Sequence, residues 1–343
     1  MHLTTAAPQE KPASRRGVLL AKALVTVALC AVIIWRGNWH AIWSSLTRAD
    51  PLLIATVFCG MLLGVTISTY KWRLLLSIHG IDFPFGRLHG FYFTSVFFNN
   101  FLPSNIGGDV YRIYRTARQR PNRAGAVVAV FSERLTGIWA LIVLGAAGGT
   151  WVYTHSRPSP PWLLPATVTF GVIALLPLIF LPVAGKAAFW FSERRWLPQK
   201  LKNVLMLLSD YRTHLLKTCQ VIAISFGFHL FTLTWMLVLS VAVGSPSSIP
   251  RLVLGIAISN LAALLPVSIN GIGLLDGSFI YVMHSLGMDF DPALMMMLLI
   301  RALLIPLSII GGLFYLRARR SIDFSRIKAH NPETTPLSPG KDR

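Results

Sequence analysis

The sequence predicts an all-α polytopic membrane protein with about six full crossings and two oppositely oriented re-entrant helical hairpins. Composition is the first reason: 54% of the 343 residues are hydrophobic and 13% are charged, with a mean hydropathy of +0.58. A soluble domain carries about 25% charged residues, so this chain has too few to cover a surface in water. Length is the second reason, because several apolar runs approach the roughly 20 residues that a helix needs to cross a bilayer.

Basic residues at the ends of those runs supply the third observation. The formal net charge is +19, from 32 Lys and Arg against 13 Asp and Glu. Nucleic acid is one partner for such an excess, but the arginines gather beside apolar runs, as the positive-inside rule requires of cytoplasmic ends. We therefore expect no nucleic-acid partner, and we use the charges to set the topology.

The first 70 residues predict a flexible cytoplasmic N-terminus and two crossings. Residues 1–16 are polar, and the apolar run 17–36 is read as a retained helix rather than a signal peptide. A second run, 51–70, is followed by Lys71. Basic residues before the first helix and after the second place both of those ends in the cytoplasm and the connection 37–50 outside.

The stretch FFNNFLPSNIGGDVYRIYR, residues 97–115, predicts the first hairpin. Arg87 precedes the segment 88–110, and an arginine cluster between 112 and 123 follows it. One full crossing would carry that cluster outside, so a segment that enters from the cytoplasm and returns there fits the charges better. Irregular backbone at membrane depth persists only inside protein or beside a wet cavity. The turn is expected to use Asn99, Asn100, Pro103, Gly107 and Gly108.

The middle of the chain predicts one helix out, one helix back and a basic segment. Residues 124–153 form the outward crossing, and residues from about 163 to 183 return. Residues 186–217 combine seven Lys and Arg with leucines near helical spacing. An amphipathic helix on the cytoplasmic surface and an ordinary loop with a small helix are equally good interpretations.

The C-terminal part predicts a second hairpin between two crossings. Residues 218–243 cross outward, and the run 252–286 is interrupted by LPVSINGIGLLDG, so it is expected to re-enter from the outside. The last crossing, 292–316, leads to a basic, disordered cytoplasmic tail, 317–343. Two interrupted segments entering from opposite faces are typical of transporters built as inverted repeats, although the two halves show no convincing residue-level repetition.

Polar residues of the first hairpin are candidates for headgroup binding. Asp109 follows two glycines and precedes a helical pattern, so a helix N-cap and a direct substrate contact are equally good interpretations. Arg112 lies on the same helical face. It is either a positive-inside anchor or a guanidinium that binds a lipid phosphate through two hydrogen bonds.

Three further charges fall at mid-depth of predicted crossings. Glu133 and Arg134 lie in the outward crossing, and Arg301 lies in the last one. A charge at the bilayer centre costs about 2.5–3.5 kcal/mol on insertion scales, so such residues face the bundle interior and find partners. We predict a Glu133–Arg301 pair and favour structural pairing over substrate binding.

The second interruption carries its own candidates. Asp276 opens a predicted helix, where a carboxylate either caps the N-terminus or meets the substrate. Gly271 and Gly273 permit close backbone approach beside Asn270. Free N–H groups at such a broken helix also suit an anionic headgroup.

Motifs for catalysis are missing from the sequence. There is no HExxH, no P-loop and no GxSxG, and the nine histidines are scattered. We therefore expect neither an enzyme nor a cofactor or metal site.

Four blocks of sequence resemble a known family: NNFLPSNIGGDVYRIY, SERLTGIWAL, LPVSINGIGLLDG and MMMLLIRALLIPLSIIGGL. Together they are similar to the lysylphosphatidylglycerol synthase transmembrane-region family, also described as flippase-like domains. The resemblance covers nearly all of residues 17–316 and implies a membrane domain that moves lipids between leaflets. It implies no lipid aminoacylation here, because only a short tail follows Arg320 where longer members carry an aminoacyltransferase domain. The family more often has glutamate where this chain has Asp276.

The expected function is to bind or translocate a lipid with an anionic or phosphate-containing headgroup between the leaflets of the cell membrane, through a polar cleft between the hairpins. The alternative is an accessory membrane protein, without transport activity, that partners a separate lipid-modifying or glycosyl-transferring enzyme. A transferase that uses Asp109 or Glu133 as a base is a weaker third reading, since no donor-binding motif is visible. Both termini are expected in the cytoplasm.

Overall fold

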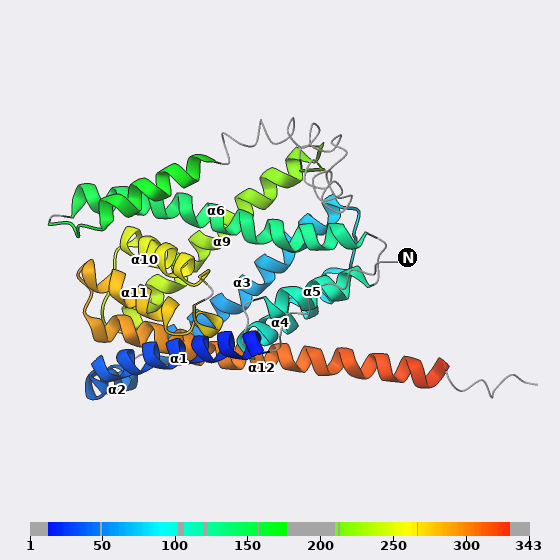
Figure 1. Cartoon of the computed structure of the whole chain (residues 1–343), viewed down its shortest axis with the longest axis horizontal. Coiled ribbons are helices and arrows are strands. Elements are labelled where there is room, and N and C mark those ends of the chain that lie inside the picture. The colour runs from blue at the N-terminus through cyan, green and yellow to red at the C-terminus, as the bar shows by residue number, and fades with distance from the viewer. Residues whose placement is uncertain are drawn as a thin grey trace, which may run out of the picture.

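The computed structural model is a bundle of helices elongated along one axis (Figure 1). Every regular element within its described residues is helical. Those residues are 13–48, 50–101, 106–118, 122–156, 158–176, 210–211, 213–265 and 267–329.

The first half of the chain forms six helices: α1 (Ala13–Arg36), α2 (Trp39–Arg48), α3 (Pro51–Ile78), α4 (Phe85–Phe101), α5 (Gly107–Ala117) and α6 (Arg123–His155). Two of the long helices, α3 and α6, start at ordinary capping signals. The Asp50 carboxylate accepts a hydrogen bond from the Leu52 amide, with Pro51 in the first turn. The Asn122 side chain accepts one from the Gly125 amide at the start of α6.

The remaining described elements are the helix Leu163–Leu176, α9 (Leu215–Ala242), α10 (Ile249–Ala262), the 3₁₀ turn η1 (Ile269–Gly271), α11 (Leu274–Ser285) and α12 (Phe290–Ala329). Four described helices are long and apolar enough to cross a membrane: Pro51–Ile78, Arg123–His155, Leu215–Ala242 and Phe290–Ala318. The helical, multi-pass membrane architecture is thereby confirmed. Six crossings and re-entry of the hairpins stay predictions.

Helices α4 and α5 form an antiparallel hairpin. Gly108, at the start of α5, lies against the end of α4, where its amide donates to the Asn99 side chain at 2.8 Å. Farther along α5, the Tyr111 ring lies 5.2 Å from Phe98, and the Arg115 guanidinium lies 4.9 Å from the Phe91 ring. Contacts thus move back along α4 as α5 advances.

Helices α10 and α11 form a second antiparallel hairpin. Gly255 in the middle of α10 packs against Phe279 and Met283 of α11, while Ala263 just beyond α10 packs against Gly271. Gly271 and Gly273 have φ of 68° and 80°, a region that glycine adopts without strain. These glycines let the chain turn between η1 and α11.

The two hairpins belong to an inverted repeat, α3–α6 and α9–α12. Helices α3 and α9 each have 28 residues and pack against one another. Gly60 meets Trp235 and Gly64 meets Phe228, so the two helices run antiparallel. Each hairpin also packs against the last helix of the other half, α4 on α12 and α10 on α6 (Figure 1).

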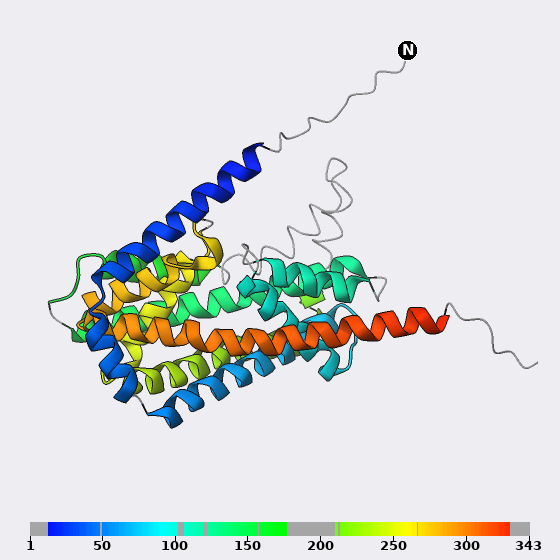
Figure 2. The ribbon, with the colours of Figure 1, turned by 90° about the horizontal axis from the view of Figure 1, so that it is seen from below.

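Most of the predicted cytoplasmic ends gather at one end of the long axis (Figure 2). The Asn122 side chain donates to the His79 carbonyl at 3.0 Å, and Lys217 donates to the Ser77 hydroxyl at 3.1 Å. The end of α3 and the starts of α6 and α9 therefore meet there. At the opposite end, the Asn38 amide donates to Asp291 at 3.1 Å. The structure thus brings these predicted cytoplasmic ends together, while their orientation in a membrane stays a prediction.

Several predicted boundaries are corrected. Asn99 and Asn100 lie in the last turn of α4, and Gly107 and Gly108 begin α5, so these four residues flank the turn as helix. Pro103 and most of the segment 186–217 lie outside the described residues.

The two ends of the apolar domain also differ from the prediction. Helix α1 begins at Ala13, inside the segment expected to be flexible, and α12 continues to Ala329, beyond the expected end at 316. Hydropathy alone therefore makes both helices too short, because a helix can continue beyond the apolar run that identifies it.

Candidate functional site

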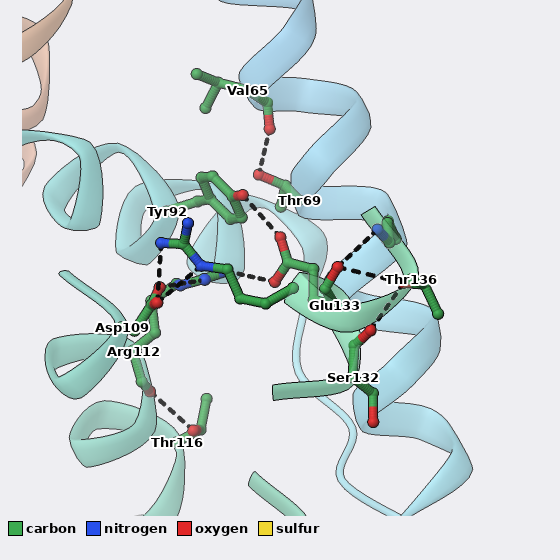
Figure 3. Close-up of polar contacts among 11 residues, drawn as sticks. Val65, Thr69, Tyr92, Asp109, Arg112, Thr116, Ser132, Glu133 and Thr136 are labelled. Atoms are coloured by element: carbon green, nitrogen blue, oxygen red, sulfur yellow. Dashed lines mark hydrogen bonds and ion pairs between the residues drawn. The ribbon is translucent and has the colours of Figure 1, made fainter. Parts of the chain in front are cut away.

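Arg112 is the centre of a buried ionic cluster formed by residues of α4, α5 and α6 (Figure 3). Its Nη2 donates to Asp109 Oδ1 at 2.7 Å, one turn earlier on α5. Its Nη1 donates to Glu133 Oε2 at 2.6 Å, on α6. Only 2% of Arg112 is exposed. A guanidinium shared by two carboxylates at these distances forms strong, charge-assisted bonds that join α5 to α6.

Helices α3 and α4 complete the surroundings of Glu133. Tyr92 of α4 donates to Glu133 Oε1 at 2.7 Å, and Lys71 of α3 donates to the Glu133 carbonyl at 2.9 Å. The Arg112 guanidinium also lies over two rings, 4.4 Å from the centre of Tyr92 and 5.0 Å from that of Trp72. Such cation–π contacts favour the charged guanidinium in a dry environment.

The asparagines of the interrupted segment close the hairpin. Asn99 Oδ1 accepts from the Gly108 amide, and Asn100 Nδ2 donates to the Ser308 hydroxyl of α12 at 2.6 Å. A side chain on Gly108 would collide with the carbonyl oxygen of Ser95. The Asn and Gly residues that break the apolar run therefore hold α4, α5 and α12 together, as unpaired backbone groups in an apolar surrounding demand.

Arg134 extends the cluster toward its surface. Its Nε and Nη2 lie 2.9 Å from Asp109 Oδ2, and 47% of its side chain is exposed. The Asp109 carboxylate thus bridges the buried Arg112 and the half-exposed Arg134. Asp109 lies in the first turn of α5, whose N-cap position is Ile106, so the N-cap interpretation of Asp109 is wrong.

Asp276 and Arg301 form the corresponding pair in the second hairpin. Arg301 Nε donates to Asp276 Oδ1 at 3.0 Å, and Arg301 Nη2 donates to Oδ2 at 2.9 Å. The same Oδ2 accepts from the Gly273 amide at 3.0 Å. The capping interpretation of Asp276 is therefore confirmed, and the residue holds an ion pair as well. Asn270 lies next to this site in η1, with φ of 53°.

The two ion pairs occupy the same register of the repeat. Asp109 precedes Arg134 by 25 residues, and Asp276 precedes Arg301 by 25. Each residue of α5 or α6 therefore has a counterpart in α11 or α12 that lies 167 positions later in the chain. The same shift relates the first residues of these helices, Gly107 to Leu274 and Arg123 to Phe290. A Leu-Pro pair precedes each aspartate, at 102–103 and 265–266. The sequence therefore does repeat, at widely spaced positions.

The predicted pair of Glu133 with Arg301 is wrong. Glu133 bonds to Arg112, and Arg301 bonds to Asp276. Each terminal nitrogen of Arg112 already donates to a carboxylate, and the residue is buried, so the direct contact between Arg112 and a lipid phosphate stays a prediction. The residues that sequence reasoning missed are Tyr92, Lys71 and Trp72, each of which has an ordinary place in an apolar helix.

Two guanidinium groups remain partly accessible. Arg134 and Arg301 are 47% and 29% exposed at their side chains, and Nη1 of each has no partner among the residues that the structure describes. A planar guanidinium with a free N–H edge suits a phosphate or carboxylate. Across the described ranges, no group of three or more His, Cys, Asp or Glu residues is placed to hold a metal ion.

Comparison with known proteins agrees with this architecture. The family described as lysylphosphatidylglycerol synthase TM region matches residues 19–311. A protein of Methanothermobacter thermautotrophicus, described as a UPF0104 membrane protein, is 24% identical over 305 residues, which cover 81% of this chain and 86% of the relative. The match extends over α3–α6 and α9–α11 and most of α12, and so includes both ion pairs. The chain belongs to the lysylphosphatidylglycerol synthase transmembrane-region family.

Proposed function

We propose that this protein moves a lipid with a phosphate-containing headgroup between leaflets, with the headgroup passing beside the two aspartate–arginine pairs. The observation that carries the proposal is the presence, at both hairpins, of a buried aspartate paired with a partly exposed arginine: Asp109–Arg134 and Asp276–Arg301. Charged groups within membrane helices are expensive and mark pathways for polar substrates. A fold that needed charge only for packing has no reason to place accessible guanidinium groups at both sites.

Binding of a phosphate to the arginine, beside the aspartate, gives each pair a chemical role. A phosphodiester carries one negative charge and accepting oxygens, as a carboxylate does, so it can take the free edge of Arg134 or Arg301 while the aspartate stays beside it. The acyl chains remain in the bilayer, and the headgroup never faces bare hydrocarbon. This makes Arg134 and Arg301 the contact residues and Arg112 a positioning residue that holds Asp109.

The topology that suits this function has both hairpins re-entrant, from opposite faces, in the cell membrane. The basic ends of α3, α5, α6 and α12 then face the cytoplasm with both termini. Hairpin tips that reach the interior of the bundle from two sides provide a headgroup with polar surroundings across the bilayer.

A leaflet-resolved lipid assay tests the proposal. The protein is reconstituted into vesicles that contain a fluorescent phosphatidylglycerol. A reductant that cannot cross the membrane then quenches the fluorophores in the outer leaflet. We expect the protein to expose inner-leaflet probe, and Arg134→Gln to slow this about tenfold, as loss of a charge-assisted hydrogen bond implies. Arg118→Gln is the matched control, because Arg118 is exposed on α5's C-terminal side and contacts only Tyr114 among the described residues. Transfer equal to that of protein-free vesicles contradicts the proposal and favours an accessory role.

A further inference from the structure

A crevice of about 240 Å³ opens between α3 and α9, next to the first ionic cluster. Its walls are mainly apolar, with Gly60, Gly64 and Met61 on α3 and Phe228 and Trp235 on α9. Tyr92 is one of the residues that line the crevice, and its hydroxyl donates to Glu133. The crevice therefore joins an apolar space between two membrane-crossing helices to the cluster that adjoins Arg134.

The repeat explains why this space exists. On one side of the α3–α9 pair, α6 packs closely against both helices. There His229 Nε2 of α9 donates to the Gly137 carbonyl of α6 at 3.0 Å, and Ala140 is fully buried. On the other side, α12 touches α3 and α9 at few positions, and the crevice lies there, lined by Leu307.

Three residues of α12 differ from their counterparts in α6. The counterparts of Gly137 and Ala140 are Leu304 and Leu307, which have larger side chains, and Leu307 lines the crevice. The counterpart of Trp139 is Pro306, which removes a helical hydrogen bond and favours a bend. The glycines of α3 deepen the groove from the opposite wall, because they have no side chain to fill it.

We infer that the crevice holds one acyl chain of the transported phospholipid. The inference rests on the proposed function and adds a second binding element to it. Acyl chains surround α3 and α9 in the bilayer, and an apolar slot lined by Tyr92, whose hydroxyl belongs to the ionic cluster, suits the acyl chain of a lipid whose headgroup lies at that cluster. A chain seated beside Tyr92 places its headgroup at the cluster that contains Arg134, and so aligns the lipid before transfer.

Photolabelling tests the crevice. The probe is a phosphatidylglycerol that carries a diazirine in one acyl chain, incorporated into vesicles with the protein. We expect labels on Met61, Thr232 and Leu307, and loss of most of them in Gly64→Leu, whose side chain fills the slot from a Cβ position 3.5 Å from Phe228. Thr232→Leu fills it from the other wall. Gly227→Leu on α9 is the control, since a Cβ there meets nothing within 4 Å.

The outcomes separate this inference from the proposed function. Crevice labelling that survives both filling variants, or labels confined to outward residues such as Leu63 and Leu230, overturns the inference. If the wild-type protein then still transfers lipid, the proposed function stands without the crevice. Crevice labelling that both filling variants remove supports the inference even when no transfer is measured, and in that case the proposed function alone fails.

Discussion

Each of the two hairpins has an aspartate–arginine ion pair, but the residues around that pair differ between them. In the first, Arg112 connects Asp109 to Glu133, and Tyr92 and Lys71 add hydrogen bonds. In the second, the counterparts of Arg112 and Glu133 are Phe279 and Ile300, which are apolar. Residues of α4 and α10 correspond at a shift of 163 positions, the separation of the two Leu-Pro pairs that follow these helices. By this shift the counterpart of Tyr92 is Gly255, which packs on Phe279.

This difference separates what the fold requires from what the site requires. An apolar core at the second hairpin shows that the fold closes without a buried Arg112–Glu133 bond. Both hairpins have a buried aspartate paired with a partly exposed arginine, which is why we assign the headgroup to these pairs. The additional charges of the first hairpin fix Asp109 from two sides, whereas Asp276 is fixed by Arg301 and the Gly273 amide.

The largest expected effect comes from removing Arg112. Arg112→Met leaves Asp109 and Glu133 buried with one fewer cation, and breaking a buried pair in this way costs about 3–5 kcal/mol. The measurement is thermal unfolding of the detergent-solubilised protein.

A double variant sharpens the same comparison. Arg112→Phe with Glu133→Ile copies the second hairpin and removes both charges, so it should recover much of the loss seen in Arg112→Phe alone. Additive losses would mean that Arg112 and Glu133 are not coupled, and that the first hairpin cannot close with the apolar pair found in the second.

Removing Arg301 should have a smaller effect. Arg301→Met deletes two hydrogen bonds to Asp276, but that pair is partly exposed and the Gly273 amide still binds the carboxylate. We expect a loss of about 1.5–3 kcal/mol by the same unfolding measurement. A loss equal to that of Arg112→Met would show that the two hairpins depend on their charges equally.

Glycine substitutions compare the packing of the two hairpins. Gly108→Ala drives a methyl group into the Ser95 carbonyl and should destabilise the protein by about 1–3 kcal/mol. Gly277→Ala, in the first turn of α11, is the control, because its Cβ lies 3.7 Å from Ile33 in ordinary contact. Equal unfolding temperatures for the two variants would contradict the close approach of α4 and α5.

The smallest effect concerns pH at the connections that precede the hairpins. Residues 79–84 include His79, whereas 243–248 contain no titratable side chain. Burial lowers the pKa of His79, against the raising effect of its hydrogen bond to Asp210. His79 therefore binds a proton more readily in the unfolded chain than in the folded one. The stability that neutral His79 contributes to the folded protein above its ordinary pKa is lost as the pH falls through 6.5 and below.

Unfolding temperatures at pH 7.5 and 5.5 measure this effect. His79→Gln should reduce the difference between the two pH values, while His155→Gln, at an exposed position at the other end of α6, should leave it unchanged. Burial also raises the pKa of the neighbouring Tyr211 to about 12, so Tyr211 stays neutral throughout and does not contribute. A pH difference that is unaffected by His79→Gln would place the titrating group elsewhere.

The sequence predicts the membrane architecture and the two interruptions because both depend on local composition. Apolar length and Gly, Pro and Asn residues mark them directly. The partner of Glu133 could not be predicted, because it depends on how α5 rotates against α6 once the hairpin closes, and nothing local encodes that angle. The repeat is hard to see because few residues carry it and the turn before Asp276 is four residues longer than the turn before Asp109.

The most direct test of the account compares lipid transfer in Arg134→Gln, Arg301→Gln and the double variant, in the vesicle assay with fluorescent phosphatidylglycerol. If a headgroup passes both pairs in turn, each single change should slow transfer about tenfold, and the double variant should be at least as slow as the slower single one. Thermal unfolding of the same preparations confirms that each variant is folded. Full transfer by Arg301→Gln, beside loss in Arg134→Gln, would contradict the claim that the two hairpins serve one path.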